Sequence, residues 1–494
     1  MADKLAEATL SSGKKIPYVI TDNPPRGGMK YTYFAPDKSY VVQFFNDPED
    51  AADPNIQSRI EAIISRYNPT LPESKGGAKG NDERIAAYFA GRFCWPTGIV
   101  VDPEFGIVCP TYPKSFFFDE SSSPVINLKG KDKKSNWFTS KNRRYLAPHE
   151  LGDLRSMMQM SLLLARSIRR LHQAGLAHSD LSNNNVLIDP KTGNCVVIDI
   201  DSLVVPGLYP PEVAGTRGYI APEVLESLNL DMNDPNRISP SSYTDLHALG
   251  VLIYEYLFLR HPLIGPKIYD MDSAENDDYL ALGPKATFIE NPDDTSNRPK
   301  DLYVTIKDLG PILEKLFLRT FVDGLHNPEY RPTAMEWERG LVKTWDLLHH
   351  CSNPSCEQKW FVLYDSSVTK CPYCGHKIAE KEIVRLKLKQ EIRGHEGQWR
   401  DYAEVDVVNN TPLFKWHFQS SVFPDEKADK TLQAYICRHN GEWFLINRNA
   451  DGLMSPEGNS VPSGQAIKLY DGAVFRMYRG ERGLLAEISI TKVR

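Results

Sequence analysis

Two short segments carry most of the information in this sequence: His178-Ser179-Asp180-Leu181-Ser182-Asn183-Asn184-Asn185 and Val196-Val197-Ile198-Asp199-Ile200-Asp201. Between them lie an apolar run and a group of turn formers at 189–194, which together predict a β-hairpin. Asp180 and Asn185 precede this hairpin and Asp199 comes at its end, so we expect the three side chains to face one cleft. Phosphoryl transfer requires such a set: a carboxylate that orients the attacking hydroxyl, and oxygen ligands for Mg²⁺.

The spacing resembles the catalytic loop of eukaryotic-type protein kinases, His-Arg-Asp-Leu with a later Asn, followed by Asp-Phe-Gly. The resemblance implies that Asp180 is the catalytic base. It also implies that Asn185 and Asp199 hold Mg²⁺ or Mn²⁺ on ATP, with Asp201 as a further candidate ligand. The expected fold is bilobal and protein-kinase-like over residues 15–347, with a small lobe over about 15–112 and a large lobe over about 113–347.

Three further motifs follow in the order in which protein kinases carry them. The segment Gly215-Thr216-Arg217-Gly218-Tyr219-Ile220-Ala221-Pro222-Glu223 resembles the end of an activation segment. Asp245 resembles the residue that braces the catalytic loop from a buried helix, and Arg331 resembles the arginine that pairs with the glutamate, here Glu223. The resemblance therefore implies structural roles for Thr216, Glu223, Asp245 and Arg331.

The small lobe departs from the usual kinase pattern at its phosphate-binding lysine. Residues 17–46 predict two or three strands, with Gly27-Gly28 at the first turn as a candidate phosphate loop. Gln43 occupies the position of the usual lysine, and a neutral amide cannot replace that charge. The with-no-lysine kinases have a glycine-loop strand that resembles Gly28-Met29-Lys30-Tyr31-Thr32-Tyr33. Lys30 is therefore our candidate for the phosphate-binding lysine. The alternative is that Lys30 is a solvated strand residue.

Other candidate nucleotide contacts follow from position along the chain. Glu61, in a helix predicted from the periodicity of residues 54–67, is the candidate partner of Lys30, and Glu83 in a second helical stretch is its competitor. Thr111 and Tyr112 belong to the expected hinge between the lobes, where adenine is held, and Leu187 is assigned to the same nucleotide site.

Several catalytic-loop residues differ from the kinase pattern. Ser179 replaces the arginine that grips an activation-loop phosphate in many kinases, so we expect no activation of that kind. Ser182 replaces a lysine that steadies the γ-phosphate, and Asp201 replaces the glycine of Asp-Phe-Gly. These changes put the catalytic rate in doubt, although the base and both metal ligands are present.

Two charged stretches lie outside these motifs. Residues 129–144 are strongly basic and surround Trp137 and Phe138, which would suit an acidic or phosphorylated partner. We favour the simpler interpretation of a solvated loop, since charge runs usually lie in solvent. Residues 270–294 are acidic and are interpreted as a surface insert of the large lobe.

Composition narrows the class of protein. The chain has 494 residues, is 41% hydrophobic and carries a net charge of −6, which indicates more than one domain and argues against a general nucleic-acid binder. No apolar run reaches ~18 residues and the amino terminus lacks a secretory pattern, so we expect no membrane span and a cytoplasmic location. Cys94, Cys109, Cys195 and Cys437 are scattered, as in a reducing compartment.

The other four cysteines predict a metal site. Cys351 and Cys356 form one pair and Cys371 and Cys374 a second, and four thiolates at this spacing suit a structural, tetrahedral Zn²⁺. The pattern resembles a zinc ribbon, over residues 348–378; a redox dithiol is the alternative. The alternating Glu and Lys that follow predict a helical linker over 379–400.

Residues 401–494 predict an all-β sandwich, from six strand-like segments separated by turn signals such as Asn440-Gly441. This part resembles a forkhead-associated domain, a phosphothreonine reader, but the Gly-Arg and Ser-x-x-His binding motifs are not found. The fold class expected for the whole chain is therefore multidomain α+β.

The domain order resembles the kinase of the bacterial tellurite-resistance and stress triad. The resemblance implies a cytoplasmic ATP- and Mg²⁺-dependent serine/threonine protein kinase, a von Willebrand A protein as partner or substrate, and a metal-dependent phosphatase as antagonist. Two alternatives stay open. A small-molecule phosphotransferase is suggested by Ile198-Asp199-Ile200-Asp201, and a nucleotide-binding scaffold without turnover by Gln43 and Ser182.

Overall fold

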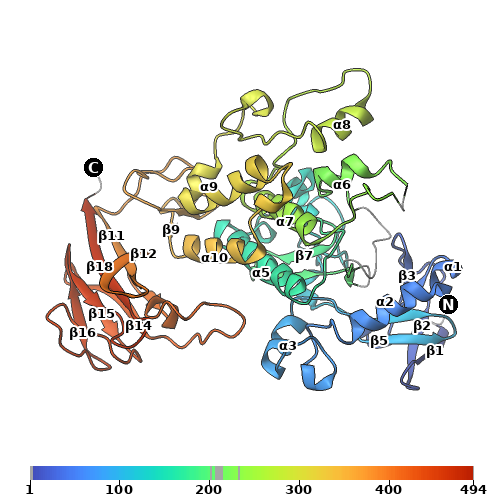
Figure 1. Ribbon diagram of the computed structural model, residues 1–494, viewed down its shortest axis with the longest axis horizontal. Coiled ribbons are helices and arrows are strands. Elements are labelled where there is room, and N and C mark those ends of the chain that lie inside the picture. The colour runs from blue at the N-terminus through green and yellow to red at the C-terminus, as the bar shows by residue number, and fades with distance from the viewer. Residues whose placement is uncertain (1–3, 201–202, 206–214, 232–233, 493–494) are drawn as a thin grey trace. The chain divides into compact units, whose positions relative to one another are not determined.

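The computed structural model describes residues 4–200, 203–205, 215–231 and 234–492, so the candidate ligand Asp201 lies outside the described residues. The chain divides into two compact units (Figure 1). Unit 1 contains residues 1–152, 156–302 and 316–338, and unit 2 contains residues 153–155, 303–315 and 339–494. No helix in the described ranges combines the length and the apolar character needed to cross a bilayer.

Unit 1 begins with a six-stranded antiparallel sheet, the core of the small lobe. Its strands are β1 (Lys4–Leu10), β2 (Lys15–Ile20), β3 (Lys30–Phe34), β4 (Tyr40–Phe45), β5 (Gly98–Asp102) and β6 (Gly106–Pro110), in the order β2-β1-β5-β6-β4-β3. The outermost strands β2 and β3 approach each other, since the rings of Tyr18 and Tyr33 stack at 5.4 Å. The expected start at residue 15 is wrong, because β1 hydrogen-bonds to both β2 and β5.

Three helices accompany this sheet: α1 (Pro48–Ala52), α2 (Pro54–Ile64) and α3 (Glu83–Ala90). The side chain of Asp53 caps the start of α2 by accepting a hydrogen bond from the backbone N–H of Asn55. The inner face of α2 buries Ile56, Ile60 and Ile63, as the sequence periodicity predicts.

The large lobe is mainly helical and surrounds a short hairpin. Its helices are α4 (Asn136–Thr139), α5 (Leu154–Gln173), α6 (Pro222–Ser227), α7 (Ser242–Phe258) and α8 (Ala274–Leu282). Helices α9 (Gly310–Leu318) and α10 (Ala334–Trp345) each have residues in both units. Strands β7 (Val186–Asp189) and β8 (Asn194–Val197) form the predicted hairpin beside the catalytic loop. Helix α7 is buried from Thr244 to Leu257, which makes it the centre of the lobe.

The basic segment 129–144 is built into the large lobe and is not the solvated loop that its charge suggested. Ile188 donates a backbone hydrogen bond to the carbonyl of Lys133 at 2.9 Å, and Lys134 forms an isolated bridge with Leu187. Phe138 is fully buried, and the Lys133 ammonium is neutralised by the buried Glu150 at 2.8 Å. The segment therefore covers the open edge of β7.

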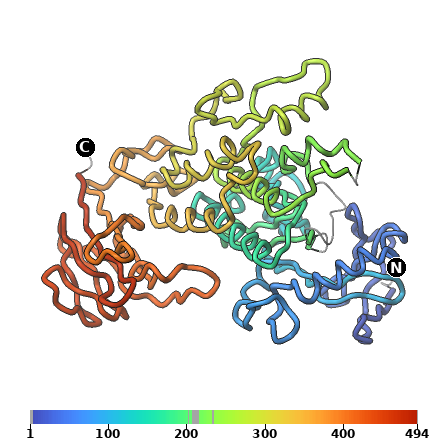
Figure 2. The backbone as a smooth tube through the Cα atoms, in the orientation of Figure 1, coloured from blue at the N-terminus to red at the C-terminus, as the bar shows by residue number. Residues whose placement is uncertain are grey.

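Unit 2 carries the cysteine-rich element and two further sheets, seen from orange to red in Figure 2. Strands β9 (Leu348–His350) and β10 (Trp360–Val362) pair next to the cysteines. One four-stranded sheet has the order β12-β11-β18-β17 and the other β13-β14-β15-β16. The remaining strands are β13 (Thr411–Leu413), β14 (Ala434–His439), β15 (Glu442–Asn447), β16 (Ala466–Leu469), β17 (Val474–Arg476) and β18 (Leu484–Lys492). Side chains from both sheets form one hydrophobic core.

The expected helical linker over 379–400 is wrong. Residues in this range form β11 (Glu382–Ile392) and the first part of β12 (His395–Val407), so the β-rich region begins near residue 382 and not at 401. The physical reason is the alternation of Val384, Leu386 and Leu388, which all point into the common core. The Glu and Lys residues between them fit the open face of a strand as well as they fit a solvated helix.

Candidate active site and metal centre

The carboxylate of Asp180 is held by two side-chain donors from different segments. Thr216 Oγ1 donates to Asp180 Oδ1 at 2.7 Å, and Asn185 Nδ2 donates to Asp180 Oδ2 at 2.8 Å. The same Nδ2 also donates to the backbone carbonyl of Asp180 at 2.9 Å. These bonds fix the carboxylate between its own loop and the segment that carries Thr216, and each oxygen keeps a second lone pair.

The loop beneath Asp180 is anchored by Asp245 at the start of α7. Asp245 Oδ2 accepts the backbone N–H of His178 at 2.8 Å and lies 3.0 Å from the Nε2 of His172. The fully buried His178 ring is 3.0 Å from the carbonyl of Ile198, so Nε2 carries the proton in this contact. His178 thus connects the loop that carries Asp180 to the residue that precedes Asp199.

Ser179 and Asp199 both adopt the left-handed backbone region, with φ of 61°. This region is uncommon for residues other than glycine, and such strained residues concentrate at functional sites. Asp199 comes two residues after the end of strand β8 and is exposed.

Lys30 and Asp199 both lie close enough to Cys109 for their charges to act on its thiol. The pKa of the Cys109 thiol is raised, first by a hydrogen bond with Cys94 and then by burial. The charge of Lys30 lowers this pKa and the charge of Asp199 raises it. Lys30 is only 9% exposed and its Nζ is 5.6 Å from the centre of the Phe45 ring, so it is not a solvated strand residue.

Gln43 and the glycine turn have defined partners. Gln43 Nε2 donates to Thr32 Oγ1 at 3.2 Å, and its Oε1 accepts from the Cys109 thiol at 3.6 Å. Asn46 Nδ2 donates to the carbonyls of Gly27 and Gly28 at 3.1 and 3.0 Å. Both glycines are exposed, so their backbone is accessible to a ligand.

Apolar residues from both lobes meet at the hinge. Tyr112 and Leu187 belong to one cluster with Phe116, Val196, Cys94 and Ile198. Burial raises the pKa of Tyr112, which keeps its hydroxyl neutral. Thr111 is half-buried, and its backbone N–H donates to the carbonyl of Ser39 at 3.1 Å. The cluster is apolar, as the lining of a site for an aromatic ligand ring usually is.

The two candidate glutamates are not gathered at this site. Glu61 is exposed on α2 and makes no ion pair within the described part of the chain. Glu83 pairs with Lys75 at 3.1 Å, and its side chain is 71% exposed. The distance in sequence from Gln43 had pointed to Glu61. However, the buried face of α2 carries its isoleucines, and Glu61 lies on the exposed side of the helix.

Glu223 and Arg331 form the ion pair expected from the sequence. Arg331 Nη1 and Nη2 donate to the two carboxylate oxygens of Glu223 at 2.7 and 2.8 Å. The arginine side chain has no exposed surface, and it also donates to the carbonyls of Gly324, Leu325 and Tyr243. This pair fixes the end of the activation segment, a few residues from Thr216.

The residues around Asp180 suit a divalent cation. Asn185 uses its nitrogen toward Asp180, which leaves its Oδ1 as a possible metal ligand, and Asp199 supplies a carboxylate at the end of the same hairpin. Hard oxygen donors of this kind are what Mg²⁺ prefers.

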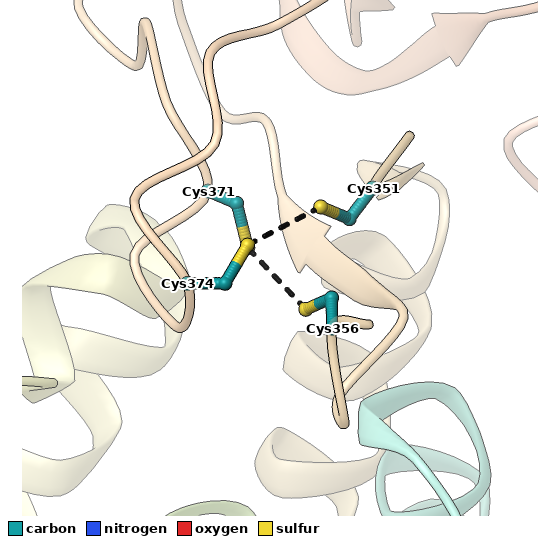
Figure 3. A group of neighbouring side chains, drawn as sticks. All are labelled: Cys351, Cys356, Cys371 and Cys374. Carbon is teal, nitrogen blue, oxygen red and sulfur yellow. Dashed lines mark hydrogen bonds between the residues drawn. The ribbon is translucent and has the colours of Figure 1, made fainter. Parts of the chain in front are cut away.

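The four clustered cysteines suit a zinc ion (Figure 3). Their four sulfur atoms lie within 4.8 Å of one another, with Cys351–Cys374 at 3.6 Å and Cys356–Cys371 at 3.9 Å. Four thiolates around Zn²⁺ at about 2.3 Å would be separated by about 3.8 Å, so the observed spacing matches a tetrahedral shell.

Some residues of the site have no marker in the sequence. His172 reaches Asp245 from the last turn of α5, and Asn136 Nδ2 donates to Asn184 Oδ1 in the catalytic loop at 3.0 Å. Glu150 is buried and neutralises both Lys133 and Lys191, at 2.8 Å each. These contacts join residues far apart in the sequence, and the residue types give no signal of the pairing.

The family model that matches this chain covers residues of the large lobe. Residues 137–336 match the family model of the protein kinase domain. The anti-Muellerian hormone type-2 receptor of Oryctolagus cuniculus is 33% identical over 138 residues, which cover 23% of this chain and 23% of that protein. The rhodopsin kinase GRK7 of Homo sapiens is 33% identical over 112 residues, covering 22% of this chain and 18% of that protein.

Another similar protein is the serine/threonine-protein kinase PSK1 of Saccharomyces cerevisiae, 34% identical over 96 residues, which cover 19% of this chain and 6% of that protein. The chain thus spans less than a quarter of the length of these curated relatives. Among solved structures, a rhoptry kinase from Toxoplasma gondii has a TM-score of 0.41 at 15% identity, covering 69% of this chain and 84% of that one.

The residues that match the family model include the loop that Asp245 anchors. The matched residues contain Asp180, Asn185 and Asp199, together with the Glu223–Arg331 pair. Residues 137–336 of the large lobe are therefore similar to the protein kinase domain.

Proposed function

We propose that this chain is an ATP- and Mg²⁺-dependent protein kinase that phosphorylates serine or threonine on a protein. The observation that carries the proposal is the fixed carboxylate of Asp180, which two donors orient beside Asn185 and the end of the hairpin. Thr216 supports the choice of serine or threonine, because its hydroxyl links the base to the segment that would hold the acceptor.

In the proposed mechanism Asp180 accepts the proton of the attacking hydroxyl. Its two hydrogen bonds hold the carboxylate in one orientation, so no reorganisation is needed as the hydroxyl approaches. Lys30 places a buried positive charge on the small-lobe side, and Tyr112 and Leu187 contact the base of the nucleotide. Asn185 and Asp199 would hold the divalent cation, which would neutralise charge on the transferred phosphoryl group.

The test is transfer of labelled γ-phosphate from ATP to protein by the purified chain. Asp180→Asn keeps the size of the side chain but removes the base, and we expect transfer to fall by about 10²–10⁴-fold. Lys30→Met should weaken both ATP binding and transfer, whereas Lys14→Met, in an exposed turn of the same lobe, is the matched control and should change neither. Transfer that survives Asp180→Asn would refute the assignment of the base.

A nucleotide-binding scaffold without turnover is the second candidate. It is favoured by Gln43, which bonds within the sheet, and by the exposed position of Glu61. ATP binding measured by calorimetry, with no transfer and no effect of Asp180→Asn, would favour this alternative.

The proposal for unit 2 is a zinc ribbon over residues 348–378 followed by a forkhead-associated-like sandwich. Cys351, Cys356, Cys371 and Cys374 would bind one structural Zn²⁺. The domain order, kinase then ribbon then sandwich, supports a role in the bacterial tellurite-resistance or stress triad. A von Willebrand A protein would then be partner or substrate, and a metal-dependent phosphatase the antagonist. Transfer assays with a candidate von Willebrand A protein test this role.

A further inference from the structure

The basic segment 129–144 is hydrogen-bonded directly to the catalytic loop. Ser135 donates its backbone N–H to the carbonyl of Val186 at 2.9 Å, and Asn136 donates its backbone N–H to the carbonyl of Asn183 at 3.2 Å. The side chains of Asn136 and Asn184 add a third bond at 3.0 Å. Because Asn183 and Asn184 lie between Asp180 and Asn185, the segment is held a few residues from the proposed base.

Ion pairs divide the lysines of this segment into two groups. Lys133 is buried against Glu150, and Lys129 pairs with Glu120 at 2.5 Å. Within the described ranges, Lys131, Lys134 and Lys141 make no ion pair with a carboxylate. Lys131 and Lys141 are exposed, and Lys134 is partly exposed.

An aromatic ring lies among these charges. Trp137 is partly exposed, and the Nζ of Lys131 is 6.0 Å from the centre of its ring. We name Lys131, Lys134, Lys141 and Trp137 the lysine patch. The patch is a local excess of positive charge on a chain whose net charge is −6. It combines point charges with an apolar surface on which the stem of a bound side chain can rest.

The two nearby arginines already form hydrogen bonds within the protein. This favours a peptide with several carboxylates over a single phosphoryl group as the ligand. Arg143 donates to the carbonyls of Phe138 and Leu151 at 3.5 and 3.1 Å, and Arg144 donates to the hydroxyl of Tyr145 at 2.6 Å. A single phosphoryl group is best bound by a free guanidinium fork. Separate lysines along an extended segment instead match several carboxylates along a peptide.

We propose that the lysine patch binds an acidic segment of the protein substrate, so that the site selects hydroxyls with Asp or Glu residues nearby in the sequence. This inference rests on the proposed kinase function, because it names the substrate class of the same site. The hydrogen bonds from Ser135 and Asn136 hold the patch at a constant position relative to Asp180. Docking there would raise the local concentration of acceptor at the base, and it would weaken as salt screens the charges.

The first experiment measures docking without catalysis. A short fluorescein-labelled peptide rich in Asp and Glu, with no Ser, Thr or Tyr, is titrated with the full chain, and a Gln- and Asn-substituted peptide of equal length is the comparison. We expect the acidic peptide to bind at least about tenfold more tightly at low salt, and we expect the double variant Lys131→Glu with Lys134→Glu to remove this preference.

The matched control reverses two exposed lysines of the same lobe, Lys285→Glu with Lys300→Glu, and changes the net charge equally. Its binding should stay within about twofold of the parent chain. Equal binding of the two peptides by the parent, or equal losses in the patch and control variants, would overturn the proposal. Equal melting temperatures for both variants would establish that neither effect comes from unfolding.

The second experiment separates docking from the kinase function. Peptides that carry one serine with acidic, neutral or basic flanks are compared by kcat/KM for γ-phosphate transfer. We expect an acidic preference of about tenfold that the patch variant loses while its hydrolysis of ATP without peptide is unchanged. Acidic-peptide binding without transfer to any peptide would overturn the kinase function alone. Transfer with no preference among the flanks would overturn the docking role alone.

Discussion

Replacing Arg331 by Met should destabilise unit 1 more than any surface substitution. The guanidinium makes two bonds to Glu223 and three to backbone carbonyls, and its side chain is fully buried. Met keeps the apolar stem but leaves the Glu223 carboxylate without its cation and the carbonyls without their donors. Removing one partner of a buried pair costs about 3–5 kcal/mol in the free energy of unfolding.

The assay is urea and thermal denaturation of the full chain, followed by circular dichroism. For a unit of more than 300 residues 1 kcal/mol corresponds to about 1.5 °C, so we expect the melting temperature to fall by about 4–8 °C. Arg331→Lys keeps the charge but not the planar fork, and should lose an intermediate amount. Arg217→Met is the matched control, because Arg217 also forms an ion pair, with Asp278, but its side chain is 68% exposed.

A double-mutant cycle tests whether the pair itself is responsible. When Glu223→Gln is combined with Arg331→Met, the loss should be smaller than the sum of the two single losses, because neither charge is then left buried alone. If Arg331→Met costs less than about 1 kcal/mol, or if the two changes add independently, the argument from the buried pair is wrong.

Three further predictions concern other parts of the molecule. Burial raises the pKa of Glu255 to about 7 from its ordinary 4.5, against the opposing hydrogen bond from Tyr219. The stabilising contribution of protonated Glu255 to the free energy of unfolding is therefore fully present below about pH 4.5 and is lost as the pH rises through 7. Melting curves from pH 4 to 8 should show the parent chain losing up to about 3 kcal/mol relative to Glu255→Gln; parallel pH profiles would contradict this. Cys371→Ser should abolish stoichiometric Zn²⁺ in metal analysis, whereas Cys437→Ser, a cysteine outside the cluster, should retain it. Asn447→Ala removes three buried hydrogen bonds, to the backbone of Ala450 and Val461, and should cost about 2–3 kcal/mol by urea denaturation; a loss below about 0.5 kcal/mol would contradict this.

The predictable part of the site is the part that depends on short-range spacing. Asp180, Asn185 and Asp199 are separated only by a loop and a hairpin, and the turn residues at 189–194 determine how that hairpin folds. Their proximity therefore follows from local geometry. The pairing of Glu223 with Arg331, over more than a hundred residues, was predictable only because the kinase resemblance supplied it.

The parts that were missed depend on contacts that the sequence does not encode locally. Strand β1 pairs with β5, which follows about 90 residues later, and nothing in residues 4–10 marks that partner. The interpretation of residues 129–144 as a solvated loop was wrong because the counter-charge of Lys133 comes from Glu150 and the buried anchor is Phe138. The linker was assigned to a helix because alternating charges fit a helix surface and a strand surface equally well.

The division of the chain into units has a consequence for biosynthesis. Unit 1 is complete once Glu338 has been translated, so this part can fold while the C-terminal third is still on the ribosome. Unit 2 also needs residues 153–155 and 303–315, which are made much earlier. These two segments must wait, without their final partners, until residues 339–494 emerge. Any single cut before residue 338 divides unit 1, and any single cut between residues 153 and 494 divides unit 2, so no single cut releases both units whole.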